Sequence, residues 1–134
     1  MLAIASNVRT IVYEMRAALI PNPTPTGYPE DLQRWIRLDD GRRVFVRPVV
    51  VADAPVLEEA LALADLETVY QRFFRAPVRL DAPTLDRLTR LDYDSRLALA
   101  ALSPRGEGAG IARYESLGGG TAEIAIVVER SWRH

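Results

Sequence analysis

Apolar residues in the last third of the chain cluster in three stretches that predict strands. Residues 96–102, 110–117 and 121–128 are rich in apolar side chains, and short glycine-containing segments separate them. The triple glycine at 118–120 predicts a turn immediately before the last of these strands. Because consecutive strands with short connections usually pair with each other, the pattern favours an antiparallel meander.

The middle of the chain has the spacing of helices instead. Asp53-Ala54-Pro55 and Asp81-Ala82-Pro83 each predict a helix start, because Asp caps the first turn and Pro fits within it. Three helices are expected, with apolar stripes at Val56, Leu57, Ala60, Leu61 and Ala64, at Leu66, Val69, Tyr70 and Phe73, and at Leu85, Leu88 and Leu91.

A further strand is predicted before these helices, at residues 43–51. Asp39-Asp40-Gly41 indicates a hairpin turn leading into it, and Pro48 within it favours an edge position or a bulge. The order of elements is therefore one full strand, helices, then three strands. This order predicts an α+β fold, with a mainly antiparallel sheet and helices between the first and second strands.

The N-terminal region has a different composition. Residues 1–20 carry apolar side chains at helical spacing, which favours a docking helix, although upstream codons read from a misplaced start would look the same. Residues 21–27 contain three prolines and predict an extended linker. The expected organisation is an N-terminal helical arm at 1–20, a Pro-rich linker at 21–27 and one domain at 28–134.

Composition narrows the classes of function. The 134 residues are 49% hydrophobic and 26% charged, as expected for one soluble domain. No apolar run approaches the ~18 residues of a membrane span, and the pattern of a secretory signal is absent, so we expect a cytoplasmic protein with no membrane partner. The formal net charge of −1 gives no broad basic field for nucleic acid.

The few chemically versatile residues limit the possible mechanisms. The chain has no cysteine, and its one histidine is His134, so a Ser-His-Asp triad, a thiolate nucleophile or a multi-histidine metal site cannot be assembled. We therefore predict no metal site. A general base, if there is one, must be a carboxylate or a tyrosine. Glu123 is a carboxylate near the start of an otherwise apolar strand.

The last fourteen residues carry a resemblance to a known family. Glu123 is followed by the apolar run Ile126-Val127-Val128, then Trp132 and Arg133. This stretch resembles the central strand of the GNAT acetyltransferase superfamily, and is most like its bacterial protein lysine acetyltransferase branch. In that family an acyl-CoA pyrophosphate loop with the pattern Q/R-x-x-G-x-G/A follows, and Arg133 aligns with its first position. The resemblance implies the N-terminal half of such a domain, truncated where the cofactor loop begins.

The resemblance also implies roles for individual residues. Glu123 would be the catalytic base, whereas without the family it reads as a half-exposed strand residue. Ile126, Val127 and Val128 would be core residues whose backbone amides also hold the pantetheine arm of acetyl-CoA. Arg133 would belong to the diphosphate clamp, or would be a solvated charge. The acyl acceptor would be an amine, possibly a protein lysine.

A second hypothesis is non-catalytic. Here the chain is a half-domain that associates with itself or with a partner, and a homodimer would form through the exposed last strand. In either case we expect the isolated stretch to be inactive. Two further features are expected to be structural: the Arg47 and Asp53 pair, with Asp53 as a helix cap, and Gly106-x-Gly108-x-Gly110, which leads into a strand and so predicts a hairpin turn rather than a nucleotide loop.

Overall fold

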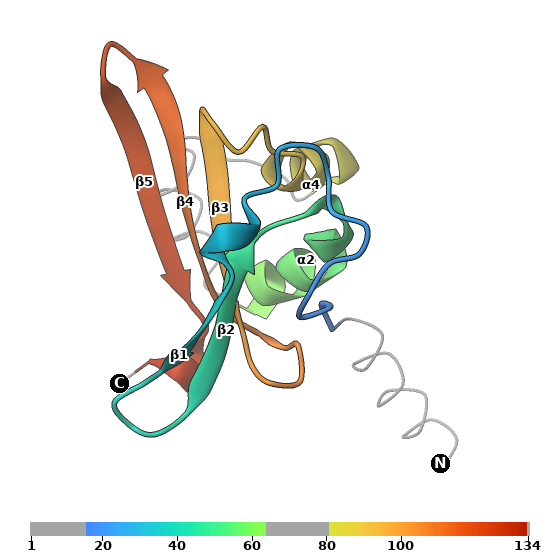
Figure 1. The fold of residues 1–134 in the computed structure, drawn as a ribbon. Coiled ribbons are helices and arrows are strands. Elements are labelled where there is room, and N and C mark those ends of the chain that lie inside the picture. The colour runs from blue at the N-terminus through green and yellow to red at the C-terminus, as the bar shows by residue number, and fades with distance from the viewer. Residues whose placement is uncertain (1–15, 64–80, 134) are drawn as a thin grey trace.

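The computed structural model describes residues 16–63 and 81–133, which form one sheet with helices on one of its faces (Figure 1). The sheet has five antiparallel strands in the order β1-β2-β3-β4-β5, so that each strand lies next to its neighbours in sequence. The strands are β1 (Arg34–Arg37), β2 (Arg43–Pro48), β3 (Arg96–Leu102), β4 (Gly108–Gly118) and β5 (Thr121–Val128). The expected α+β fold is confirmed, with the helices after the first full strand, β2.

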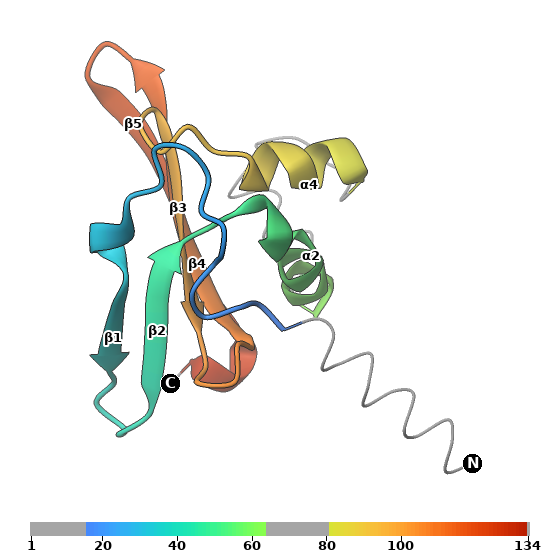
Figure 2. The ribbon, with the colours of Figure 1, turned by 45° about the vertical axis from the view of Figure 1, so that its right-hand side comes forward.

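Two α-helices cover the same face of the sheet, as the two views of Figures 1 and 2 show. They are α2 (Ala54–Leu63) and α4 (Ala82–Thr89), and three short 3-10 helices lie at η1 (Glu30–Leu32), η2 (Val51–Asp53) and η3 (Arg130–Trp132). Asp81 caps α4 as predicted, because its carboxylate accepts a hydrogen bond from the Thr84 N–H at 2.9 Å. The predicted helix with Leu66, Val69, Tyr70 and Phe73 lies outside the described residues.

The predicted turns and strands agree closely with the structure. The hairpins fall at Asp39–Gly41, at the 103–107 segment and at the triple glycine, where Gly118, Gly119 and Gly120 all have positive φ. Strand β2 ends at Pro48, three residues earlier than predicted. Although β2 is an inner strand, Pro48 lies beyond the last residue paired with β1, so its missing N–H interrupts no ladder there.

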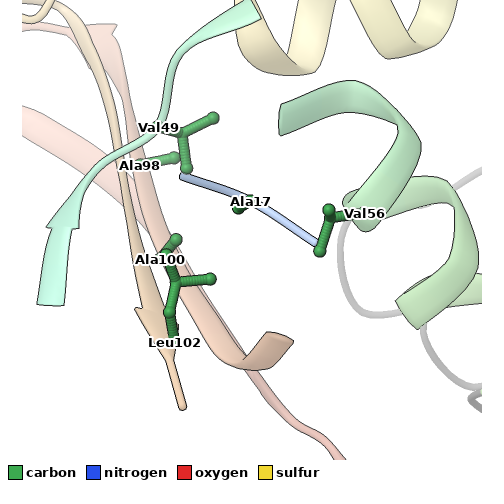
Figure 3. Packing of buried hydrophobic residues seen from close by; sticks show 6 residues of the cluster. All are labelled: Ala17, Val49, Val56, Ala98, Ala100 and Leu102. Carbon is green, nitrogen blue, oxygen red and sulfur yellow. The ribbon is translucent and has the colours of Figure 1, made fainter. Parts of the chain in front are cut away.

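The core lies between the sheet and α2, and an N-terminal segment fills part of it (Figure 3). Its main cluster contains Ala17, Val49, Val56, Ala98, Ala100 and Leu102. Residues 16–20 were expected at the end of a helix, but they are not helical, and the Ala17 N–H donates to the Gly106 carbonyl at 2.9 Å. The rest of the predicted arm, residues 1–15, lies outside the described residues.

Arg47 and Asp53 form a buried ion pair under this segment. The guanidinium is fully buried and donates to both carboxylate oxygens, at 2.8 and 2.7 Å, and to the Ala18 carbonyl at 2.8 Å. Asp53 also accepts from the Val50 N–H at 2.9 Å. The structural role expected for this pair is confirmed. Asp53 also caps a helix, but as the third residue of η2, where it accepts from the Val50 N–H, and not as the N-cap of α2.

Candidate functional site

The two faces of β5 have different surroundings. The burial of its side chains alternates along the strand, with Glu123, Ala125 and Val127 partly buried on the side of the helices. Val127 packs against the apolar cluster of Leu57, Leu85 and Leu88, which α2 and α4 contribute. Glu123 therefore points to the helix-covered side of the sheet, at the end of β5 that follows the glycine turn.

The other face of β5 is apolar and exposed. Ile124 is 72% exposed, Ile126 62% and Val128 38%. The expectation that Ile126 and Val128 are core residues is therefore wrong within the part of the chain that the structure describes. The physical reason is that α2 and α4 lie on the opposite side of the sheet, so period-two alternation buries Val127 and exposes its two neighbours.

The outer edge of β5 is unpaired among the described strands, because β5 ends the sheet. Glu129 donates its N–H to the Ala109 carbonyl at 2.8 Å, and residues 109 and 129 continue the register of β4 with β5. Since hydrogen-bonding direction alternates along a strand, residues 123, 125 and 127 bond toward β4. The backbone N–H and C=O groups of Ile124, Ile126 and Val128 therefore point to the open edge.

Arg133 lies at this same edge. Its Nε donates to the Val128 carbonyl at 2.8 Å, and the side chain is exposed. The turn that carries it is held against the β1–β2 hairpin, where the Arg42 guanidinium stacks 4.2 Å from the centre of the Trp132 ring and donates to the Ser131 carbonyl at 2.9 Å. The structure thus brings Arg133 together with Val128.

Glu123 lies apart from these residues. It is five positions before Val128, which at about 3.3 Å per residue places it roughly 17 Å along the strand. Across β4 its direct partner is Glu115. The predicted base and the predicted cofactor-binding residues therefore occupy opposite ends of one strand.

A charged cluster next to Glu123 was not singled out from the sequence. Glu115 lies 3.1 Å from Arg87 Nη2, 3.6 Å from Arg113 Nη2 and 3.7 Å from Arg96 Nε. These arginines come from α4, β4 and the start of β3. The signal in the sequence was the spacing of Arg113 and Glu115, two charged residues on one face of a strand whose face is otherwise apolar.

Burial dominates the electrostatics of Arg113, whose side chain is only 9% exposed. Desolvation lowers the pKa of its guanidinium, the nearby carboxylate of Glu115 opposes that shift, and the Arg96 and Arg87 charges reinforce it. The weaker favourable influence of Glu123 shows that this carboxylate lies within electrostatic reach of Arg113.

The described tyrosines are engaged elsewhere. Tyr28 donates its hydroxyl to the Pro48 carbonyl at 3.2 Å, Tyr93 donates to the Val49 carbonyl at 2.7 Å, and Tyr114 donates to the Asp94 carbonyl. Burial raises the pKa of Tyr28, and raises that of Tyr93 to about 12. The raised pKa values make Tyr28 and Tyr93 poorer candidates for a base at neutral pH than a carboxylate.

The described ranges, 16–63 and 81–133, contain neither a membrane-spanning helix nor a cluster of metal-ligating side chains. No helix there is long and apolar enough to span a membrane. No group of three or more metal-ligating side chains gathers there either.

Comparison with known proteins shows which solved structures this chain resembles. No family model matches the sequence. The structure is similar to the crystal structure of the GNAT domain of S. lividans PAT, with a TM-score of 0.67 and 34% sequence identity, over 78% of this chain and 64% of that chain. It is also similar to a cAMP-binding acyltransferase from Mycobacterium smegmatis, with a TM-score of 0.43 and 20% identity, over 99% of this chain and 35% of that chain.

The similarity to the S. lividans domain is the one that counts here, because the TM-score of the second protein is too low to support an argument. This chain spans less than two thirds of the length of that domain. With 34% sequence identity to that domain and the same α+β arrangement, the chain has a GNAT-like fold and resembles the bacterial protein lysine acetyltransferase branch of that superfamily.

Proposed function

We propose that this protein is part of an acetyl-CoA-dependent N-acetyltransferase that transfers an acetyl group to an amine, with a protein lysine as the acceptor. The observation that supports the proposal most directly is that β5 presents a carboxylate on one face and unpaired backbone groups along its outer edge. One end of this strand presents Glu123 to the helix-covered side of the sheet, and its outer edge offers unpaired backbone groups. The similarity to the GNAT domain of S. lividans PAT supports acyl transfer in general.

Glu123 would act as the base. A lysine-like amine has a pKa near ~10.4 and must lose a proton before it attacks a thioester carbon. The carboxylate would accept this proton, directly or through a water molecule. The new bond joins the amine nitrogen to the acyl carbon, and the bond from that carbon to sulfur breaks, which releases the CoA thiol.

The outer edge of β5 would hold the pantetheine arm as an added strand. Ile126 and Val128 present backbone N–H groups there, whereas the Val127 N–H faces β4 in the alternating ladder. The backbone N–H groups of Ile126 and Val128 thus point in the direction that this role requires, whereas that of Val127 does not. Arg133 is anchored beside Val128 and would contribute positive charge for the diphosphate.

The test of the base is Glu123→Gln, measured with acetyl-CoA and a lysine-containing peptide in the longest polypeptide that carries these residues. The expected turnover falls at least about 100-fold, because general-base catalysis is lost, while the Kd for acetyl-CoA stays nearly unchanged. Glu107→Gln, at an exposed carboxylate in the β3–β4 turn, is the matched control. Unchanged turnover in Glu123→Gln would show that the base is another group.

A second candidate function is self-association through β5, favoured by the exposure of Ile124 and Ile126 at an unpaired sheet edge. In this case two copies would pair along their outer edges into a continuous sheet. Ile126→Pro is a selective test, since proline removes an N–H that points outward and leaves the β4 ladder intact.

Analytical ultracentrifugation over a range of protein concentrations distinguishes a monomer from this dimer. The unmodified chain is expected to show a dimer that Ile126→Pro abolishes, whereas Leu117→Lys, at a residue 60% exposed near the hairpin tip, leaves it in place. A chain that remains monomeric at every concentration would exclude the second candidate and leave the enzyme as the single proposal.

A further inference from the structure

Three guanidinium groups surround one carboxylate beside Glu123. Arg87, Arg96 and Arg113 each lie within 4 Å of Glu115, but only Arg87 is close enough, at 3.1 Å, to form a hydrogen bond with it. The contacts from Arg96 and Arg113 are 3.7 and 3.6 Å long, beyond hydrogen-bonding distance. Two of the three arginines are thus ion-paired with Glu115 but not hydrogen-bonded to it.

Their donors are incompletely used. The Arg113 side chain is nine-tenths buried, yet it makes no hydrogen bond within the described residues. Arg96 donates through Nη2 to the Arg87 carbonyl, but its Nε is buried and has no hydrogen-bond partner. Because a buried donor left unpaired is costly, the Arg96 Nε, beside an Arg113 guanidinium that makes no hydrogen bond in the described ranges, suits an oxygen ligand that accepts from both arginines.

The balance of charge favours an anion. The charged groups that face this point are Arg87 from α4, Arg96 from β3, Arg113 and Glu115 from β4, and Glu123 from β5. Three positive charges therefore meet two negative ones. A carboxylate is the natural counterpart, because an arginine fork binds its two oxygens in a bidentate manner.

The position of the cluster relates it to the reaction. Arg113 lies opposite Ala125, so Glu123 is its diagonal neighbour across β4 and β5. Diagonal neighbours on one face of a sheet lie about 7–8 Å apart, which is close to the spacing between side chains two residues apart on one face of an extended peptide. A carboxylate held by Arg113 would therefore lie two residues away from an amine held at Glu123.

We propose that Arg96 and Arg113 form a subsite for a carboxylate of the acyl acceptor, which makes a lysine with an acidic residue two positions away the preferred substrate. This assignment of substrate class rests on the proposed function. It predicts binding as well as turnover, so it can be tested separately from the role of Glu123 as the base.

The test uses two peptides that differ in one residue, one with the sequence Lys-Ala-Glu and the other with Lys-Ala-Gln. Binding to the 134-residue chain is followed through the Nε–H signals of its arginines in NMR spectra. The glutamate peptide is expected to bind at least about tenfold more tightly, because it adds charge-assisted hydrogen bonds, and to shift the Arg96 and Arg113 signals. The glutamine peptide is expected to leave both signals unmoved.

Substitutions of Arg96 and Arg113 then test whether these residues cause the preference for the glutamate peptide. Arg113→Met and, separately, Arg96→Met are expected to make the two peptides bind equally, while Arg113→Lys retains part of the difference. Arg90→Met is the matched control, because Arg90 is an exposed residue directly after α4 and pairs with Asp86. Equal binding of both peptides to the unmodified chain would overturn the proposal, as would a preference that survives in both methionine variants.

If binding discriminates between the peptides but Glu123→Gln leaves turnover intact, the subsite stands and the base assignment fails. If Glu123→Gln abolishes turnover but the peptides bind equally, the base stands and the subsite fails. The two hypotheses therefore have separate outcomes.

Discussion

Glu115 and Glu123 lie directly opposite each other on β4 and β5, so two carboxylates face one another across a ladder. Like charges in opposed positions destabilise a sheet. Glu123→Gln removes this repulsion, and we expect the free energy of unfolding to rise by about 0.2–1 kcal/mol. Urea denaturation at pH 7 measures the change. A loss of stability would mean that Glu123 has a structural partner.

The other member of the pair has the opposite effect. Glu115→Gln is expected to lower the free energy of unfolding by about 1–3 kcal/mol, because the buried Arg113 loses its carboxylate. The same denaturation experiment measures it. Equal effects of the two substitutions would argue against a special environment for either residue.

The buried pair of Arg47 and Asp53 predicts a large energetic coupling. Asp53→Asn leaves a fully buried guanidinium without its counter-charge, and we expect a loss of about 3–5 kcal/mol in the free energy of unfolding. The double variant Arg47→Met with Asp53→Asn is expected to lose less than the sum of the two single changes. Asp86→Asn, in an exposed pair, is the control, with an effect of about 0–1 kcal/mol.

The surroundings of Gly106 predict that any side chain at this position collides with the N-terminal segment. Its φ is +85°, and a Cβ there would lie 2.2 Å from the Ala17 carbonyl oxygen. Gly41 has a similar φ of +91° but nothing within 4 Å of the same position. Gly41→Ala therefore carries conformational strain alone, about 1–2 kcal/mol, and Gly106→Ala is expected to cost at least about 1 kcal/mol more. Similar thermal stability of the two variants would show that residues 16–20 are not packed against this turn.

The lowered pKa of Asp92 predicts that the stability of the fold depends on pH in the acidic range. The Ser95 hydroxyl, followed by the backbone N–H groups of Asp94 and Arg96, lowers the pKa of Asp92 from 3.8 to about 2. A depressed carboxyl pKa stabilises the fold above the unfolded value, and this contribution is lost as pH falls through about 2. The difference in stability between the unmodified chain and Asp92→Asn is therefore expected to be constant above pH 5 and to shrink between pH 4 and pH 2. A difference independent of pH would refute the assignment.

Local patterns in the sequence were sufficient for many elements. Strand β5 was predicted with the bounds that the structure has, because a triple glycine and a run rich in β-branched residues specify a turn and a strand within eleven residues. The cap of α4 was predicted for a similar reason, since Asp81 bonds to a backbone N–H only three residues away. The same start signal at Asp53 also predicted a helix correctly, since α2 begins at Ala54, but its carboxylate bonds to the buried Arg47 and to the Val50 N–H instead of the first turn of α2.

By itself, the sequence determined the elements of this protein, the absence of histidine or cysteine chemistry from residues 1–133 and the position of Glu123 on a strand. Tertiary structure alone decided which face of β5 meets α2 and α4, and hence that Val127 is packed while Ile124 and Ile126 are exposed. It also decided that Arg87, Arg96 and Arg113 gather at Glu115. The physical reason is that alternation assigns residues to faces without saying which face is covered, and groups 28 residues apart meet only through strand register and helix packing.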